Sequence, residues 1–327
     1  MKTDHTLIID RYLGSVIGAT VGDALGAGYE FTNPSEDDQI EMCGGGLFDW
    51  APGEWTDDTQ MTLGILKALA EDESTPVAIA ANFIEWYESN PPDIGTQTRN
   101  VLGSTADAHE LHIMSAAFLD ANPGAAGNGA LMRTSPVPLI TRTDRNKIAD
   151  FATEIASLTH AHKDSISACI LWSLALHEAI HSGTYGSDFD WVGTVRNGIN
   201  YLDPGKKERW EKLIGDTEIK DPRTFNPNGW VVTAFQAALS VIQQTPIKEE
   251  DPSSHFKDTL VNAVKIGDDT DTVASIAGAY LGAVWGKSAI PDEWIRNIHG
   301  YRISNGESFT VEDLQKLVLL AINNQRS

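Results

Sequence analysis

The amino-acid sequence predicts an all-α fold, on three observations. Apolar residues recur with the i, i+3, i+4, i+7 spacing of one helix face, in the clearest case at Val273, Ile276, Ala277, Tyr280, Leu281 and Val284. Strict two-residue alternation is scarce, so any sheet is expected to be minor. No internal repeat of roughly 20–50 residues is found, which argues against a helical solenoid.

Helical spacing continues along most of the chain. Beyond the first and last glycine-rich helices, we expect helices at 61–70, 75–88, 147–158, 165–181, 231–243, 256–265 and 311–323. The length of 327 residues would permit two domains at about 150 residues each. No Pro/Gly/Ser-rich linker divides the sequence, so we expect one compact domain covering residues 1–327.

The first helix carries glycines at every fourth position, and a second helix near the C-terminus repeats this spacing. The residues are Gly14, Gly18, Gly22 and Gly26 in the first, and Ala274, Gly278 and Gly282 in the second. A glycine inside a helix costs about 1 kcal/mol relative to alanine. Close approach of another helix is the predicted reason, so the two helices are expected to pack backbone to backbone. A gap left for a ligand is the alternative.

Charge and cysteine content narrow the function classes. The formal net charge is −22, so the chain lacks the basic surface that unmodified nucleic acid or an anionic membrane requires. A pyrophosphate substrate would need local compensation from metal ions or helix N-termini. Two cysteines, Cys43 and Cys169, form no disulfide framework. Neither a signal peptide nor a membrane span is expected, and a cytoplasmic location is predicted.

Two acidic segments, 56–59 and 268–272, each stand just before an apolar helical run. Helix capping explains either one alone, because Thr and Asp satisfy free backbone N–H groups at a helix start. Together, they could supply carboxylate and hydroxyl oxygens from opposite sides of one cleft, which suits a hard cation such as Mg²⁺. The chain has no comparable Cys and His set for zinc. If the glycine-rich helices pack together, the carboxylates should converge.

Six segments resemble, in the same order, those of the ADP-ribosylglycohydrolase family. They are Gly22–Gly26 with Glu30-Phe31, Trp55–Met61, Pro92–Gly95, Gly127–Arg133, Thr159–His162 and Gly267–Thr272. The resemblance runs from about Leu13 to Gly286. It implies a compact all-helical fold with a central dinuclear magnesium cleft, manganese being the alternative ion. The implied metal ligands are Thr56, Asp57, Asp58, Asp269, Asp271 and Thr272. Asp57 and Asp271 would be shared between ions, whereas Asp268 is not expected to be a ligand.

By the same resemblance, the chain would hydrolyse the glycosidic bond that links ADP-ribose to a modified acceptor. Paired metals polarise the reacting group, and a carboxylate handles the proton. Asp93, in a Pro-Pro-Asp-Ile-Gly turn, is the first candidate for that role, and Glu30 the second. Because arginine-directed members carry this Asp-x-Gly loop, ADP-ribosylarginine is the expected substrate. A carboxylate suits a guanidinium, which it can bind through two hydrogen bonds.

Further residues are expected to contact the substrate, namely Gly95, Gly127, Asn128, Gly129, His162 and Trp230. The Gly-Asn-Gly segment is interpreted as a loop that opens a short helix and approaches a phosphate, with Arg133 buried beneath it. A plain turn is the alternative. His162 would line the distal ribose and phosphate, or be structural. Trp230 would stack on adenine, or belong to the core.

Other function classes remain open at this point. A catalytically silent ADP-ribose-binding relative would keep the fold, although all six ligand positions are present here. Another two-metal hydrolase, such as a phosphatase, is less consistent with the sequence, because an adjacent His-Asp pair is missing. The acceptor is not fixed by the sequence: serine or O-acetyl-ADP-ribose is the alternative to arginine. The expected partner is an ADP-ribosylated protein or a small ADP-ribose conjugate.

Overall fold

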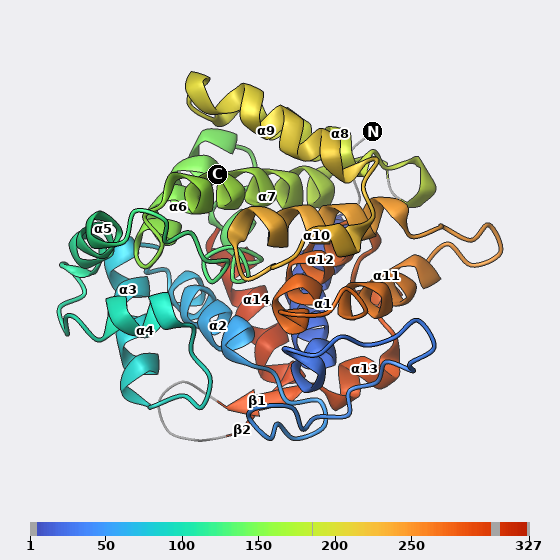
Figure 1. Cartoon of the computed structure of the whole chain (residues 1–327), viewed down its shortest axis with the longest axis horizontal. Helices are drawn as coiled ribbons and strands as arrows, with labels where there is room; N and C mark the ends of the chain where they lie inside the picture. Colours follow the sequence, from blue (N-terminus) through green and yellow to red (C-terminus); the bar gives the residue numbers. More distant parts are fainter. Residues whose placement is uncertain (1–4, 185, 302–307, 326–327) are drawn as a thin grey trace.

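The computed structural model describes residues 5–184, 186–301 and 308–325, and regular structure in these ranges is almost entirely helical (Figure 1). The sheet found there pairs β1 (His299–Tyr301) with β2 (Ser308–Thr310) in antiparallel register. The all-α prediction is therefore confirmed. The α-helices are α1 (His5–Gly26), α2 (Asp57–Ala70), α3 (Pro76–Glu88), α4 (Thr96–Leu102), α5 (Leu111–Ala121), α6 (Arg145–Ser157), α7 (Lys163–His181), α8 (Trp191–Asn197), α9 (Pro204–Thr217), α10 (Val231–Gln244), α11 (Ser254–Val264), α12 (Thr270–Trp285), α13 (Asp292–Asn297) and α14 (Val311–Asn324).

The helices expected from apolar spacing are all found, whereas α4, α5, α8, α9 and α13 were not predicted. α9 shows why. Its sequence is dominated by charged residues, and only Trp210, Ile214 and Thr217 of its side chains are buried. Three buried positions in fourteen residues give too weak a period for the helix to be recognised from the sequence alone.

α1 and α12 lie side by side at the centre of the molecule, and the other helices surround them (Figure 1). α12 is buried from Thr270 to Val284, and α1 is buried continuously from Gly14 to Gly26. Helices that are buried on every side must pack through all of their faces. Their ends therefore place polar groups inside the protein.

The glycine stripes form the contact between these two helices, as predicted. A Cβ atom added to Gly14, Gly18 or Gly22 would overlap backbone atoms of α12. One added to Gly278 or Gly282 would overlap backbone atoms of α1. The cost of helical glycine is offset here by close backbone packing, and the ligand-gap alternative is excluded for this face.

Among the residues that the structure describes, no helix combines the length and the apolar character needed to cross a bilayer.

The helix contact makes Gly278 intolerant of any side chain. We expect Gly278→Ala to lower the free energy of unfolding by about 1–3 kcal/mol, because the added methyl overpacks the α1–α12 interface. Gly215→Ala is the matched control, since a Cβ atom on this α9 glycine meets nothing within 4 Å. Its better helix propensity should stabilise the protein by up to about 1 kcal/mol. Urea unfolding of both variants measures the difference, and equal effects would contradict the packing argument.

Candidate active site

The two acidic segments meet at the N-terminal ends of α2 and α12. The Thr56 hydroxyl donates a hydrogen bond to Asp271 Oδ2 at 3.3 Å, across 215 positions of sequence. In return, the Thr272 hydroxyl donates one to Asp58 Oδ2 at 3.2 Å, across 214 positions. The predicted convergence of the segments is therefore confirmed, and it follows directly from the packing of α1 against α12.

Helix capping accounts for the start of α2 but not for the start of α12. Thr56 is the N-cap residue of α2, and its hydroxyl accepts a hydrogen bond from the Asp58 N–H at 3.4 Å. Asp269 holds the N-cap position of α12, yet its side chain makes no capping bond. Its Oδ2 instead accepts a hydrogen bond from Asn128 Nδ2 at 2.7 Å. The Asp269 carboxylate is thus free of helix capping and available to the site.

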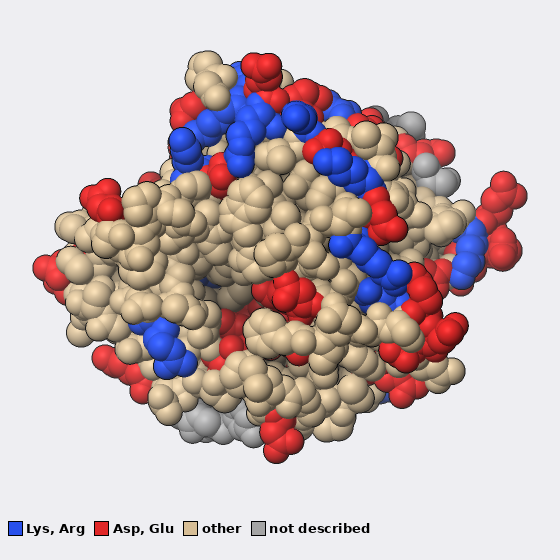
Figure 2. Space-filling view, in the orientation of Figure 1, with Lys and Arg blue, Asp and Glu red and all other residues tan. Residues whose placement is uncertain are grey.

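A cavity of about 400 Å³ opens where the segments meet, and Figure 2 shows acidic side chains gathered in a hollow on this face. The predicted site residues that line it are Glu30, Asp57, Asp93, Gly95, Gly127, Asn128, Gly129, Asp269, Asp271 and Thr272. Thr56 and Asp58 lie behind this wall, bonded to Asp271 and Thr272. Among the described residues, no Lys or Arg lines the cavity. Its electrostatic field is therefore that of the carboxylates.

The carboxylates have few partners within the protein. Glu30, Asp269 and Asp271 each offer one oxygen, and these oxygens lie within 4.8 Å of one another. Within the described residues, Glu30 Oε2, Asp58 Oδ1 and Asp271 Oδ1 are buried without a hydrogen-bond partner. Unpaired buried carboxylate oxygens are costly unless they are protonated or coordinate a cation. This donor set therefore fits hard divalent cations.

Burial and mutual repulsion raise the pKa of these acids. The pKa of Glu30 is raised to about 8, first by burial and then by the charges of Asp269 and Asp57. That of Asp93 is raised to about 7 by burial and by the charge of Glu30. Burial likewise holds the pKa of Asp271 well above its ordinary value. A cation in the cavity would oppose all of these shifts, because it favours the ionised form.

Asp93 lies beside Asp57, at the end of the loop that precedes α4. Burial and then the charge of Asp93 hold the pKa of Asp57 well above its ordinary value. Asp93 is only 9% exposed. The Pro-Pro-Asp-Ile-Gly turn thus places a carboxylate in the wall of the cavity that Glu30 also lines.

Asp23 is a positioning residue to which the sequence analysis gave no role. It is fully buried on α1, where it accepts hydrogen bonds from the Thr56 N–H (2.9 Å), the Thr59 N–H (3.0 Å) and the Thr59 hydroxyl (2.6 Å). Burial raises its pKa to about 6, against the effect of these bonds. Asp23 therefore ties the start of α2 to α1. Its signal in the sequence was an acid within the glycine stripe.

Asn228 holds the second acidic segment in place, and this residue too was given no role from the sequence. Its Oδ1 accepts a hydrogen bond from the Asp269 N–H at 2.9 Å, and its Nδ2 donates to the Gly267 carbonyl at 3.0 Å. Its own N–H donates to Asp268 Oδ2 at 3.0 Å. The Asp268 side chain thus stabilises the conformation of this loop. Asn128 Nδ2 completes the connection by donating to the Asn228 carbonyl at 3.0 Å.

The Gly-Asn-Gly segment lines the cavity, but the short helix expected after it is absent, since residues 129–133 form turns. The Gly127 N–H points at Gln97 Oε1 (3.4 Å), and the Asn128 N–H donates to the Gly229 carbonyl (3.2 Å). Two of its three amides are therefore already engaged within the protein. A Cβ atom on Gly129 would lie 3.1–3.2 Å from the His160 ring, a tight contact, whereas one on Gly127 would lie 3.4 Å from it, an ordinary contact. Packing against His160 therefore favours glycine at position 129.

His160, and not His162, is among the residues that line the cavity. His162 instead caps α7, its Nδ1 accepting a hydrogen bond from the Asp164 N–H at 3.1 Å. Burial, followed by the charge of Arg133, lowers the pKa of His160 to about 3. A neutral His160 is thus a structural support for the glycine segment. Two histidines spaced two apart gave no means of telling these positions apart from sequence.

Arg133 is fully buried, as expected. It donates to the Thr159 hydroxyl at 2.7 Å and lies 4.4 Å from the ring centroid of Phe83. Trp230 is 40% exposed at the start of α10 and lies outside the cavity lining, although its neighbour Gly229 is part of that lining. The aromatic residues that do line the cavity are Phe31 and Phe48, neither of which was assigned a role from the sequence.

The site is a buried carboxylate cavity in an all-helical scaffold, and comparison with known proteins identifies the family. The family model described as ADP-ribosylglycohydrolase matches residues 4–326. The chain therefore belongs to the ADP-ribosylglycohydrolase family, whose members hydrolyse ADP-ribose linkages.

Relatives within this family differ in the linkage that their names give. The chain is 30% identical to the ADP-ribosyl-[dinitrogen reductase] glycohydrolase of Rhodospirillum rubrum, over 88% of this chain and 90% of the relative. It is 28% identical to the ADP-ribosylarginine hydrolase Tri1 of Pseudomonas putida, over 89% and 74%. Human ADP-ribosylhydrolase ARH3 is 24% identical, over 90% of each chain. A solved structure titled ADP-ribosylglycohydrolase-related protein complex superimposes with a TM-score of 0.76 at 25% identity, covering 98% and 100%.

The crowding of carboxylates predicts that the site is destabilising without a cation. We expect Asp271→Asn to raise the melting temperature of the EDTA-treated protein, because it removes one buried like charge. Added Mg²⁺ should stabilise the wild type more than this variant. Glu208→Gln, which removes an exposed acid on α9, is the matched control and should change neither quantity. A lower melting temperature for metal-free Asp271→Asn would contradict the repulsion argument.

Proposed function

We propose that this chain is a magnesium-dependent hydrolase that releases ADP-ribose from ADP-ribosylarginine in a protein. The observation that carries the proposal is the group of buried, unpartnered carboxylate oxygens facing one cavity. Six residues would hold two Mg²⁺ ions, with Mn²⁺ as the alternative: Thr56, Asp57, Asp58, Asp269, Asp271 and Thr272. When bound, the ions would polarise ribose hydroxyls or a water beside the anomeric carbon.

The residues of the chain divide the remaining work. Asp93 and Glu30 line the cavity next to the proposed ligands. We assign Asp93 to the acceptor, where its carboxylate would pair with the guanidinium. Glu30 would hold the ribose and is the second acid/base. Asp23 and Asn228 position the two ligand segments through the hydrogen bonds described above.

The proton balance is simple for an arginine substrate. A carboxylate takes one proton from the attacking water, the water oxygen bonds to the anomeric carbon, and the carbon–nitrogen bond breaks. The guanidine leaves as a neutral base and receives that proton. Asp93 is the group assigned to this transfer, because the same carboxylate then faces both the water and the leaving nitrogen.

The rest of the cavity would bind the ADP-ribose. We propose that Gly95, Gly127, Asn128 and Gly129 border the ribose and pyrophosphate. Because the backbone amides of Gly127 and Asn128 are engaged within the protein, the Gly129 N–H would make the amide contact of this segment with the substrate. His162 and Trp230 lie outside the cavity lining, so their proposed contacts are with the distal, solvent-facing part of the substrate.

Two assays test the activity and the acceptor. The purified protein is incubated with Mg²⁺ and one of three substrates, ADP-ribosyl-arginine peptide, ADP-ribosyl-serine peptide or O-acetyl-ADP-ribose, and free ADP-ribose is measured. We expect faster release from the arginine peptide, abolished by EDTA and restored by Mg²⁺. Preference for the serine peptide or for O-acetyl-ADP-ribose would contradict arginine as the acceptor and would identify the substrate instead. No release from any acceptor, with ADP-ribose binding intact, would identify a silent binding relative.

Asp93→Asn isolates the proton-transfer role. We expect turnover of the arginine peptide to fall by about 100-fold or more, the usual contribution of a general acid–base group. Affinity for ADP-ribose, measured by calorimetry, should change little, because the metal ligands remain. Asp120→Asn, an acid at the surface end of α5, serves as the control. Unchanged turnover in Asp93→Asn would remove this residue from the mechanism.

A further inference from the structure

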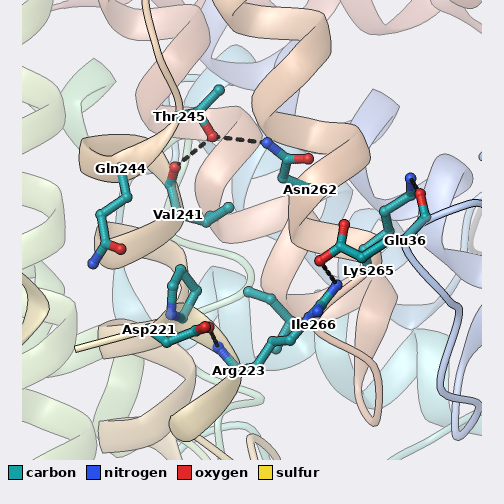
Figure 3. A pocket seen from close by; sticks show the side chains of 10 residues that line it. Glu36, Asp221, Arg223, Val241, Gln244, Thr245, Asn262, Lys265 and Ile266 are labelled. Carbon is teal, nitrogen blue, oxygen red and sulfur yellow. Dashed lines mark hydrogen bonds and ion pairs between the residues drawn. The ribbon is translucent and has the colours of Figure 1, made fainter.

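A second cavity, of about 270 Å³, lies between the C-terminal ends of α10 and α11 and the segment around Glu36 (Figure 3). None of the residues that line it also lines the candidate active site. It is therefore a separate concave site.

Two basic side chains converge at this cavity on one carboxylate residue. Arg223 Nη2 forms an ion pair with Glu36 Oε1 at 2.5 Å, and Lys265 Nζ donates to the Glu36 carbonyl oxygen at 2.5 Å (Figure 3). The cations come from separate parts of the chain, Arg223 from a 3₁₀ turn before α10 and Lys265 from the end of α11. A second acid, Asp221, also lines the cavity, where its Oδ1 accepts a hydrogen bond from the Arg223 backbone N–H at 2.9 Å. The two cationic side-chain groups therefore face Glu36, whereas Asp221 bonds to backbone.

The ion pair that holds the Glu36 carboxylate next to Arg223 is weak. Its side chain is 71% exposed and that of Arg223 is 42% exposed. An exposed ion pair of this kind contributes about 0–1 kcal/mol. Replacing the Glu36 carboxylate with another oxyanion would therefore cost little, since the charge count is kept and Glu36 returns to water.

The inner wall of the cavity is polar. Thr245 donates its hydroxyl to the Val241 carbonyl at 2.8 Å and accepts a hydrogen bond from Asn262 Nδ2 at 3.1 Å. Figure 3 shows the Asn262 amide nitrogen directed at Thr245 and its oxygen at the other end of the amide. That oxygen is an acceptor for a ligand hydroxyl. Gln244 also lines the cavity, but its Nε2 is engaged with the Thr217 and Lys220 carbonyls at 3.0 and 2.6 Å.

We propose that this cavity binds a small organic oxyanion with a hydroxylated body, whose carboxylate or phosphate takes the place of the Glu36 side chain. The guanidinium of Arg223 binds such a group through two parallel hydrogen bonds, and Lys265 adds a point charge. The Asn262 amide oxygen accepts a hydrogen bond from a hydroxyl group of the ligand. Binding here is independent of the reaction proposed for the first cavity.

Calorimetric titration tests this site with three probes: inorganic phosphate, ribose 5-phosphate and malate. The probes separate a phosphate ester from a hydroxylated carboxylate. We expect saturable binding that is tighter in Glu36→Gln, because the internal competitor is removed. Arg223→Gln should weaken it by about tenfold or more, the effect of losing charge-assisted hydrogen bonds. Lys265→Gln, which changes the second cation, should weaken it in the same direction.

Arg196→Gln is the matched control, because Arg196 forms exposed ion pairs with Glu211 and Glu218 away from this cavity. The affinity of Arg196→Gln for the probes should equal that of the wild type. Melting curves confirm that each variant is folded. Two outcomes overturn the proposal: the absence of saturable binding in folded Glu36→Gln, or equal affinities in Arg223→Gln and Arg196→Gln, which would place the anion elsewhere.

Discussion

The contact between the backbones of α1 and α12 is the constraint on which the rest of the structure depends. Glycine at every fourth position brings the two helices so close that the N-terminus of α12 lies beside Gly26. Asp271 is thereby buried next to Asp23 and the start of α2. With larger residues in the stripe, the helices would separate, and the carboxylates would face water. A packing feature with no chemistry of its own therefore determines the geometry of the site.

The fold holds these carboxylates close together although burial and mutual repulsion disfavour their charges. Several ionisable acids share one cavity, and burial disfavours each charge by several kcal/mol before repulsion is counted. The surrounding structure holds them with neutral donors, such as the Thr59 hydroxyl on Asp23 and the Asn128 amide on Asp269. Neutral donors fix the carboxylates in place and leave their charge intact, whereas an arginine would cancel it. The cavity thus remains attractive to cations and unsatisfied without them.

The sequence predicted the parts of this arrangement that arise from periodicity and repetition. Glycine spacing predicted the helix contact, and the two acidic segments predicted their meeting. It did not predict α9, because charged surface helices have little apolar period. Nor could it assign Asn228 or separate His160 from His162, since these roles depend on loops whose paths are set by tertiary hydrogen bonds. The prediction of a short helix after Gly129 was wrong for the same reason. The Asn128 side chain is hydrogen-bonded to Asp269 and Asn228, and the residues that follow form turns.

The distribution of basic residues completes the electrostatic argument. Among the described residues, none lines the acidic cavity, whereas Arg223 and Lys265 meet at the second one. Next to the acidic cavity, the Phe31 N–H donates to the Asp268 carbonyl (2.6 Å) and the Asp268 N–H donates to the Thr32 carbonyl (2.9 Å). At the second cavity the basic side chains are accompanied by two acids, Glu36 and Asp221, and Arg223 forms an ion pair with Glu36. The described part of the acidic cavity has no Lys or Arg in its lining, so no ion pair with a lining cation neutralises its carboxylates. Their charge must be compensated by protons or by a bound cation.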